Sequence, residues 1–138
     1  MMDAPKKEKL RIILDANFFF VPSQFRVDIF EELANLLSKR FEPILLSSTK
    51  TELEGLANSN PKIRNQAILG LKLAEKCKFV FVEKNPTETF DDVIVRVASD
   101  WNCPVATNDK ELKKRLREKG VTTIFLRQKQ RLAMEGTV

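Results

Sequence analysis

Residues 11–20 read RIILDANFFF, a short apolar run that ends on a carboxylate and an amide. An apolar run of this length is typical of a strand buried inside a sheet. Asp15 follows the strand directly, and the sequence shows no immediate helix whose free amides it would cap. We therefore take Asp15 as a candidate functional group and ask whether other acids accompany it.

Strand and helix patterns alternate along the rest of the chain. Short apolar runs predict five strands, at residues 11–14, 43–47, 79–82, 104–107 and 122–126. Apolar residues at helical spacing predict helices between them, at 24–39, from 48 or 49 onward, at 61–76, 90–101 and 109–120, with a turn at 21–27. This order favours an α/β fold, a three-layer α/β/α sandwich with a central, mostly parallel sheet of about five strands.

The length of 138 residues fits one domain. We expect residues 1–10 to be a flexible lead-in, 11–126 to form the domain and 127–138 to form a basic C-terminal tail. No apolar stretch is long enough to span a membrane, and the N-terminus does not resemble a secretory signal. Cys77 and Cys103 form no CxxC pattern, so we expect reduced, buried cysteines and a cytoplasmic protein.

The composition excludes several kinds of chemistry. The chain has neither His nor Tyr, which excludes His metal ligands and Ser-His-Asp triads. No GxGxxG follows the first strand, so a dinucleotide-binding domain is disfavoured. Glu83 and Lys84, rather than a phospho-acceptor Asp, follow the third strand, which disfavours a receiver domain. Any catalysis must therefore use carboxylates, hydroxyls, Lys, Arg or a metal.

Acidic residues follow the strands in a pattern that places them at one rim of the sheet, where ligands of open α/β sheets bind. These acids are Asp15, Glu52, Asp91, Asp92 and Asp109. Carboxylates crowded together repel one another, so either some are protonated or a cation lies among them. Oxygen ligands without His or Cys select hard ions, which predicts Mg²⁺ or Mn²⁺. The alternative is structural: the last three acids can cap helices, and Glu54 can be a solvated surface acid.

Basic residues concentrate near the C-terminus. Residues 110–131 contain nine basic and two acidic side chains, whereas the net charge of the whole chain is only +5. Lys110, Lys113, Lys114 and Arg117 have the spacing of one helix face and begin beside Asp109. A basic surface next to an acidic metal pocket suits a phosphodiester backbone. A solvated basic helix is the alternative.

Four segments resemble the acidic blocks of the PIN-domain ribonucleases. They are ILDANFFF with Asp15, SSTKTELEGL with Glu52, FDDVIVRVA with Asp91 and VATNDKEL with Asp109. The resemblance covers about residues 11–132, and DDVIVRVA, TNDKELKKRLREKGV and IFLRQKQRL are most similar to the small-subunit rRNA-processing endonucleases. It implies a PIN-like domain that acts as a metal-dependent endoribonuclease on single-stranded RNA, with an rRNA precursor as the expected substrate.

Residue by residue, the resemblance implies roles for particular side chains. Asp15, Glu52, Asp91 and Asp109 would be the catalytic, metal-binding acids. Asn17 and Thr107 would support them, and Asp92 would be an outer acid, because Asp91 has the family's spacing of eighteen residues from Asp109. The RNA-binding residues would be Lys110, Lys113, Lys114, Arg117, Arg127 and Lys129.

Two other functions stay open at this point. The ribonucleases of toxin–antitoxin pairs share the same acids. A non-catalytic RNA-binding protein of ribosome assembly would use the basic residues alone. The sequence also leaves open whether the protein is a monomer or a homodimer.

Overall fold

The computed structural model describes residues 9–37 and 40–136. Its elements in chain order are β1 (Leu10–Leu14), η1 (Ala16–Phe20), α1 (Val21–Phe25), α2 (Ile29–Leu37), β2 (Phe41–Leu46), α3 (Ser47–Ser59), α4 (Arg64–Ala74), β3 (Lys78–Val80), α5 (Phe90–Trp101), β4 (Val105–Ala106), α6 (Lys110–Glu118), β5 (Thr123–Arg127) and β6 (Arg131–Glu135). The predicted α/β class with a central, mostly parallel sheet is confirmed.

The sheet has one strand more than predicted. Its six strands lie in the order β3-β2-β1-β4-β5-β6, and the first five are parallel. Strand β6 pairs antiparallel with β5 over Thr123–Arg127 and Arg131–Glu135. Residues 131–135, expected in a basic tail, are therefore part of the sheet, because the turn after β5 is short enough for the chain to fold back.

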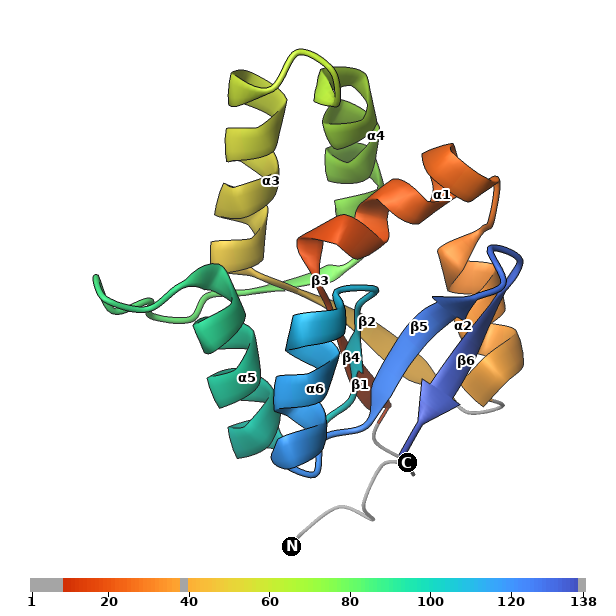
Figure 1. Ribbon diagram of the computed structural model, residues 1–138, viewed down its shortest axis with the longest axis vertical. Helices are drawn as coiled ribbons and strands as arrows, with labels where there is room; N and C mark the ends of the chain where they lie inside the picture. The colour runs from red at the N-terminus through yellow and green to blue at the C-terminus, as the bar shows by residue number, and fades with distance from the viewer. Residues whose placement is uncertain (1–8, 38–39, 137–138) are drawn as a thin grey trace, which may run out of the picture.

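The apolar run after Arg11 is buried because helices cover both faces of the sheet. Ile12 and Leu14 pack with side chains of η1, α2 and α3, whereas Ile13 packs with side chains of α5 and α6. Successive strand residues point to opposite faces, so one apolar run contributes to both cores. Figure 1 shows α5 and α6 side by side, with α2 beyond the opposite side of the sheet.

The segment between β1 and β2 is more helical than predicted. Residues 16–25, which include most of the expected turn, form η1, a 3-10 helix, and the α-helix α1. Arg26 ends α1 with a left-handed backbone at φ 55°. Asp28 Oδ1 then accepts hydrogen bonds from the backbone amides of Phe30 and Glu31, at 3.1 Å each. The helix predicted from residue 24 therefore begins at Ile29, and residues 38–39 at its expected end lie outside the described residues.

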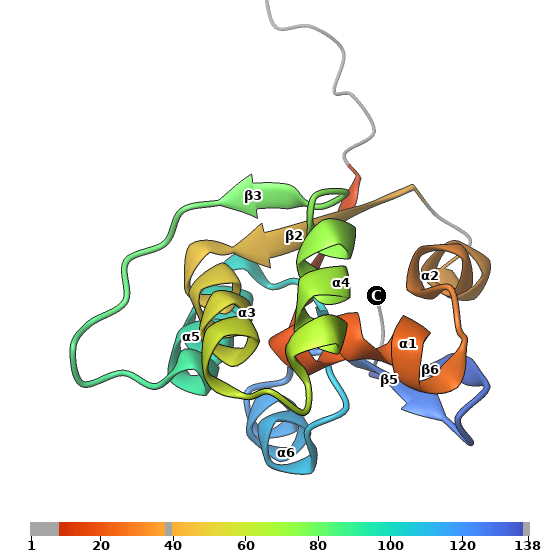
Figure 2. The same ribbon diagram turned by 90° about the horizontal axis from the view of Figure 1, so that it is seen from above.

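The order of strands fixes where a ligand can bind. From β1 the chain continues through β2 to β3 on one side, and then returns to β4, β5 and β6 on the other. Ligand sites of open α/β sheets lie at such a switch, beyond the carboxyl ends of the strands. Here the switch lies between β1 and β4, so the residues that follow these two strands are the first candidates. Figures 1 and 2 show the first turns of α3, α5 and α6 near this rim.

Candidate active site

The structure places the four sequence-predicted acids on four elements around this rim. Asp15 follows β1, Glu52 lies in the second turn of α3, Asp91 lies in the first turn of α5, and Asp109 is the N-cap of α6. The pKa of Glu52 responds to the charges of the other three acids, so all four share one electrostatic environment. Residues far apart in the sequence therefore form a single acidic site.

Asp15 is the most enclosed of these acids, with 4% of its surface exposed. Its Oδ1 accepts a hydrogen bond from the Ala16 backbone amide at 2.8 Å, and its Oδ2 accepts one from the Thr107 hydroxyl at 2.7 Å. Burial raises the pKa of Asp15 to about 6, with smaller contributions from Asp91 and Asp109, although both hydrogen bonds act to lower it. Contrary to the sequence-based expectation, Asp15 also caps a helical turn, because η1 begins at Ala16.

Glu52 has a buried carboxylate oxygen, Oε1, that lacks a hydrogen-bond partner among the described residues. Burial, and then the charges of Asp15, Asp91 and Asp109 in that order of importance, together raise the pKa of Glu52 to about 7. A buried carboxylate oxygen without a donor is costly unless it is protonated or meets a cation.

Asp91 and Asp109 complete the group in different ways. Burial raises the pKa of Asp91, the charge of Asp109 adds to this, and Arg115 partly offsets it. Among the described residues no donor forms a hydrogen bond to the Asp91 carboxylate. Asp109 Oδ1 accepts from the Leu112 amide at 3.0 Å, so this residue caps α6 as the structural alternative predicted. Its second oxygen takes no part in that cap.

Thr107 and Asn17 connect the segments that carry the acids. The Thr107 hydroxyl, which donates to Asp15, also accepts from the Asp109 amide at 3.1 Å and so links β1 to the start of α6. Asn17 Oδ1 accepts from the Asn108 amide at 3.5 Å, and Asn108 Oδ1 accepts from the Leu126 amide of β5 at 2.7 Å. Both residues hold the β4–α6 loop against its neighbours.

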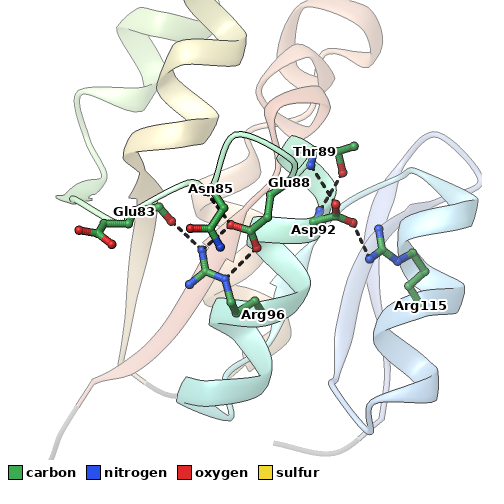
Figure 3. A network of polar contacts seen from close by, with 7 residues as sticks. All are labelled: Glu83, Asn85, Glu88, Thr89, Asp92, Arg96 and Arg115. Atoms are coloured by element: carbon green, nitrogen blue, oxygen red, sulfur yellow. Dashed lines mark hydrogen bonds and ion pairs between the residues drawn. The ribbon is translucent and has the colours of Figure 1, made fainter.

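Asp92, expected as an outer acid of the site, is engaged elsewhere. It forms a capping box with Thr89 at the start of α5, and its Oδ1 lies 2.8 Å from Arg115 Nη2 on α6 (Figure 3). The hydrogen bond from the Thr89 amide, and then that from Arg115, lower the pKa of Asp92. Its charge is therefore compensated, and the pair joins the two helices that carry Asp91 and Asp109.

A second arginine holds the loop that leads to α5. Arg96 donates to both carboxylate oxygens of Glu88, at 2.9 and 3.0 Å, and to the backbone carbonyl of Glu83 at 2.6 Å (Figure 3). The backbone amide of Asn85 also donates to Glu88 Oε1 at 3.0 Å. The contacts of Arg96 and Arg115 were not predicted from the sequence, whereas the helix over residues 90–101 was, and the spacing of Thr89 and Asp92 is the capping signal at its start.

The predicted RNA-binding residues do not form one uniform face. Lys110 and Lys114 are exposed on α6, but Lys113 Nζ lies 4.1 Å from the centre of the Phe125 ring, and Arg117 Nε lies 2.9 Å from Glu135 on β6. Arg127 ends β5 and Lys129 follows in the turn to β6. Because β5 is parallel to β1, that turn lies toward the same rim as Asp15. The side chains that form no ion pair within the described residues, those of Lys110, Lys114, Arg127 and Lys129, therefore adjoin the rim from two sides.

The chemistry of the acidic group fits a hard divalent cation. All candidate donors are oxygens, the chain has no His, and Glu52 presents a buried oxygen without a donor. Within residues 9–37 and 40–136, no group of three or more Asp, Glu or Cys side chains is already arranged to hold a metal ion. The carboxylates would have to rearrange on binding.

None of the described helices is both long and apolar enough to cross a membrane.

A mostly parallel sheet with four carboxylates gathered at its rim defines an α/β domain with an acidic site. This chain belongs to the PIN-like domain family, whose sequence model matches residues 12–129. The family predicted from the four acidic segments is thereby confirmed.

The chain is similar to several characterised proteins. It is 30% identical to Ribonuclease VapC4 of Methanocaldococcus jannaschii over 93% of this chain and 98% of the relative. It is 33% identical to the rRNA-processing protein fcf1 of Schizosaccharomyces pombe, over 78% of this chain and 53% of that protein. Among solved structures, the PIN domain endonuclease Utp24 superimposes with a TM-score of 0.75 at 27% identity, covering 93% of this chain and 92% of that one.

The raised pKa values predict how stability depends on pH. The pKa values of Asp15 and Glu52 are about 6 and 7 in the folded protein, above the ordinary 3.8 and 4.5. Between pH 5 and 8 the folded state therefore binds more protons than the unfolded state, and raising the pH favours unfolding. Urea unfolding in EDTA should show a free energy of unfolding that falls across this range. The Asp15→Asn, Glu52→Gln double variant should show a flatter dependence, and an equally steep dependence in that variant would contradict the assignment.

Proposed function

We propose that this protein is a metal-dependent endoribonuclease that hydrolyses phosphodiester bonds in single-stranded RNA. The nuclease class is supported by the family and by relatives named as ribonucleases and as an endonuclease. The observation that carries the assignment to this site is Glu52 Oε1, which is buried without a donor in the field of three other acids. A purely structural acid would be expected to have a partner.

Asp15, Glu52, Asp91 and Asp109 would hold Mg²⁺ or Mn²⁺ in this proposal, with no ligand from His or Cys. A bound ion of this kind lowers the pKa of coordinated water and neutralises phosphate charge, so no histidine base is required. The protein itself contributes position and charge. Thr107 fixes Asp15 and the start of α6 together, and the Asp92–Arg115 pair joins α5 to α6.

The RNA backbone would cross the rim between α6 and the β5–β6 turn. Lys110 and Lys114 on one side, and Arg127 and Lys129 on the other, are exposed and would contact phosphates. Lys113 and Arg117 are engaged with Phe125 and Glu135, so we assign them a smaller share of the binding energy.

The substrate we propose is an rRNA precursor, and the cytoplasm is the proposed location. The name of the S. pombe relative, rRNA-processing protein, supports this substrate. The similarity to Ribonuclease VapC4 spans almost all of both chains and keeps a toxin-type ribonuclease as the alternative. The free cysteines Cys77 and Cys103 are compatible with a reducing compartment.

Removal of one carboxylate tests the catalytic site. Glu52→Gln should lower the kcat of Mn²⁺-dependent cleavage of single-stranded RNA at least about 100-fold, because a neutral amide cannot supply the charge that the ion requires. Glu54→Gln, on an exposed position of the same helix, is the matched control and should stay within about twofold of the original rate. Equal losses in both variants, or no cleavage by the unmodified protein with either metal, would contradict the proposal and favour the non-catalytic alternative.

The salt dependence of binding tests the RNA path. Lys110→Ala and Lys114→Ala should each make the slope of log Kobs against log salt less steep by about 0.7, the value for one phosphate contact on a single strand. Lys119→Ala, at the opposite end of the same helix, should leave the slope unchanged. Fluorescence anisotropy with RNA in EDTA measures all three slopes, and an equal effect of Lys119→Ala would rule out this path.

A further inference from the structure

Two phenylalanines are exposed at the edge of the sheet. Phe79 lies in β3 and is 52% exposed, and Phe81 follows β3 and is 73% exposed. Strand β3 is the terminal strand of the sheet and pairs only with β2 among the described strands. The exposure of Phe81 exceeds that of every other large apolar side chain that the structure describes. The nuclease site described above does not use either ring.

The alternation of side chains places both rings on one face. Val80 and Val82 pack against the core that contains Val93 and other residues of α5. Because neighbouring residues of an extended chain point to opposite sides, Phe79 and Phe81 point to the other side of the edge. Both phenylalanines thus form one surface, which we call the β3 aromatic patch.

One lysine lies at this patch, and two more flank it in the sequence. Lys50 Nζ, on α3, lies 5.6 Å from the centre of the Phe79 ring. Lys78, which precedes Phe79, is exposed and lies 3.8 Å from Glu42, and Lys84, in the loop toward α5, has its Nζ 5.6 Å from the centre of the Phe90 ring. Among the described residues no cation lies over the Phe81 ring, which is therefore open on its exposed side. Aromatic rings bordered by flexible cations suit a single-stranded polyanion, whose bases stack while its phosphates pair with lysines.

The patch is connected to the acidic site through two short segments. The Ser47 hydroxyl donates to the Val82 carbonyl at 3.1 Å and accepts from the Val82 amide at 2.9 Å, and Ser47 begins the helix that carries Glu52. In the other direction, the loop after Val82 leads to Asp91 and is held to α5 by Arg96 (Figures 2 and 3). The patch therefore has a fixed position relative to two of the four acids.

We propose that Phe79 and Phe81 form a stacking platform for unpaired bases of single-stranded RNA. This platform lies beside the acidic site, at the edge of the sheet formed by β3. Its relation to cleavage rests on the proposed function. The RNA would extend from the basic α6 side, past the acids, to this platform. Pairing of β3 with a second copy of the chain is less favourable, because the strand has only three residues and carries an exposed lysine.

RNA binding by the full-length chain in EDTA tests the platform without any need for cleavage. Phe81→Ala should raise the Kd for a short unstructured RNA by about 5-fold to 150-fold, the cost of losing one stacked base. Leu69→Ala removes a side chain that is 50% exposed on α4 and is the matched control, with Kd expected within about twofold. Phe81→Trp should restore binding, because it keeps a stacking surface.

An RNA with abasic positions provides the readout that a structural defect would not move. The unmodified protein should bind it more weakly than the intact RNA, whereas for Phe81→Ala this difference should be smaller, because only the Phe79 ring remains for stacking. An unchanged Kd in Phe81→Ala would overturn the platform, as would a change from dimer to monomer in sedimentation, which would make the patch an interface between copies.

Cleavage kinetics separate this inference from the nuclease proposal. In the presence of Mn²⁺, Phe81→Ala should raise KM with little change in kcat, since it removes binding rather than a reacting group. Loss of binding in Phe81→Ala, together with no cleavage by the unmodified protein, would keep the platform and overturn the nuclease. Cleavage with unchanged Kd and KM in Phe81→Ala would do the reverse.

Discussion

Burial of the Asp15 carboxylate at the point where the strand order reverses is the constraint on which the site depends. The Asp15 amide donates to the Ala106 carbonyl at 3.0 Å, and its carboxylate accepts from Thr107, so β1 and β4 end together. Two hydrogen bonds stabilise the ionised form, yet burial still raises its pKa to about 6. The protein thus assembles a charged site that its own donors do not fully satisfy, which is the condition under which a cation binds.

Two neighbouring acids, Asp91 and Asp92, have different surroundings in the structure. Asp91 accepts no hydrogen bond from the described residues and its pKa is raised, chiefly by burial. Asp92, the next residue, caps α5 and pairs with Arg115, and its pKa is lowered. One turn of helix therefore supplies both a carboxylate for the site and the contact that holds α5 against α6.

The features that depend on short stretches of sequence were predicted correctly. The apolar run that ends at Asp15 and the helical spacing of residues 90–101 indicated the α/β order, and the four acidic segments indicated the family. The strand β6 was missed because its apolar run, Leu132 to Met134, is only three residues long and lies between charged residues, and its pairing with β5 depends on the turn that joins them. Arg96 and Arg115 were missed because their partners come from other turns and other helices. The exposure of Phe81 was not predicted either, because a phenylalanine is expected to be buried in the core when only the sequence is known.

Anomalous diffraction from crystals soaked in Mn²⁺ is the decisive measurement for the acidic site. One or more anomalous peaks should appear, bounded by the carboxylates of Asp15, Glu52, Asp91 and Asp109, with Glu52 Oε1 directed at an ion or at a water bound to it. The peaks should be absent from crystals of Asp15→Asn soaked in the same way. Strong Mn²⁺ peaks elsewhere on the protein with none among these four acids would contradict the account.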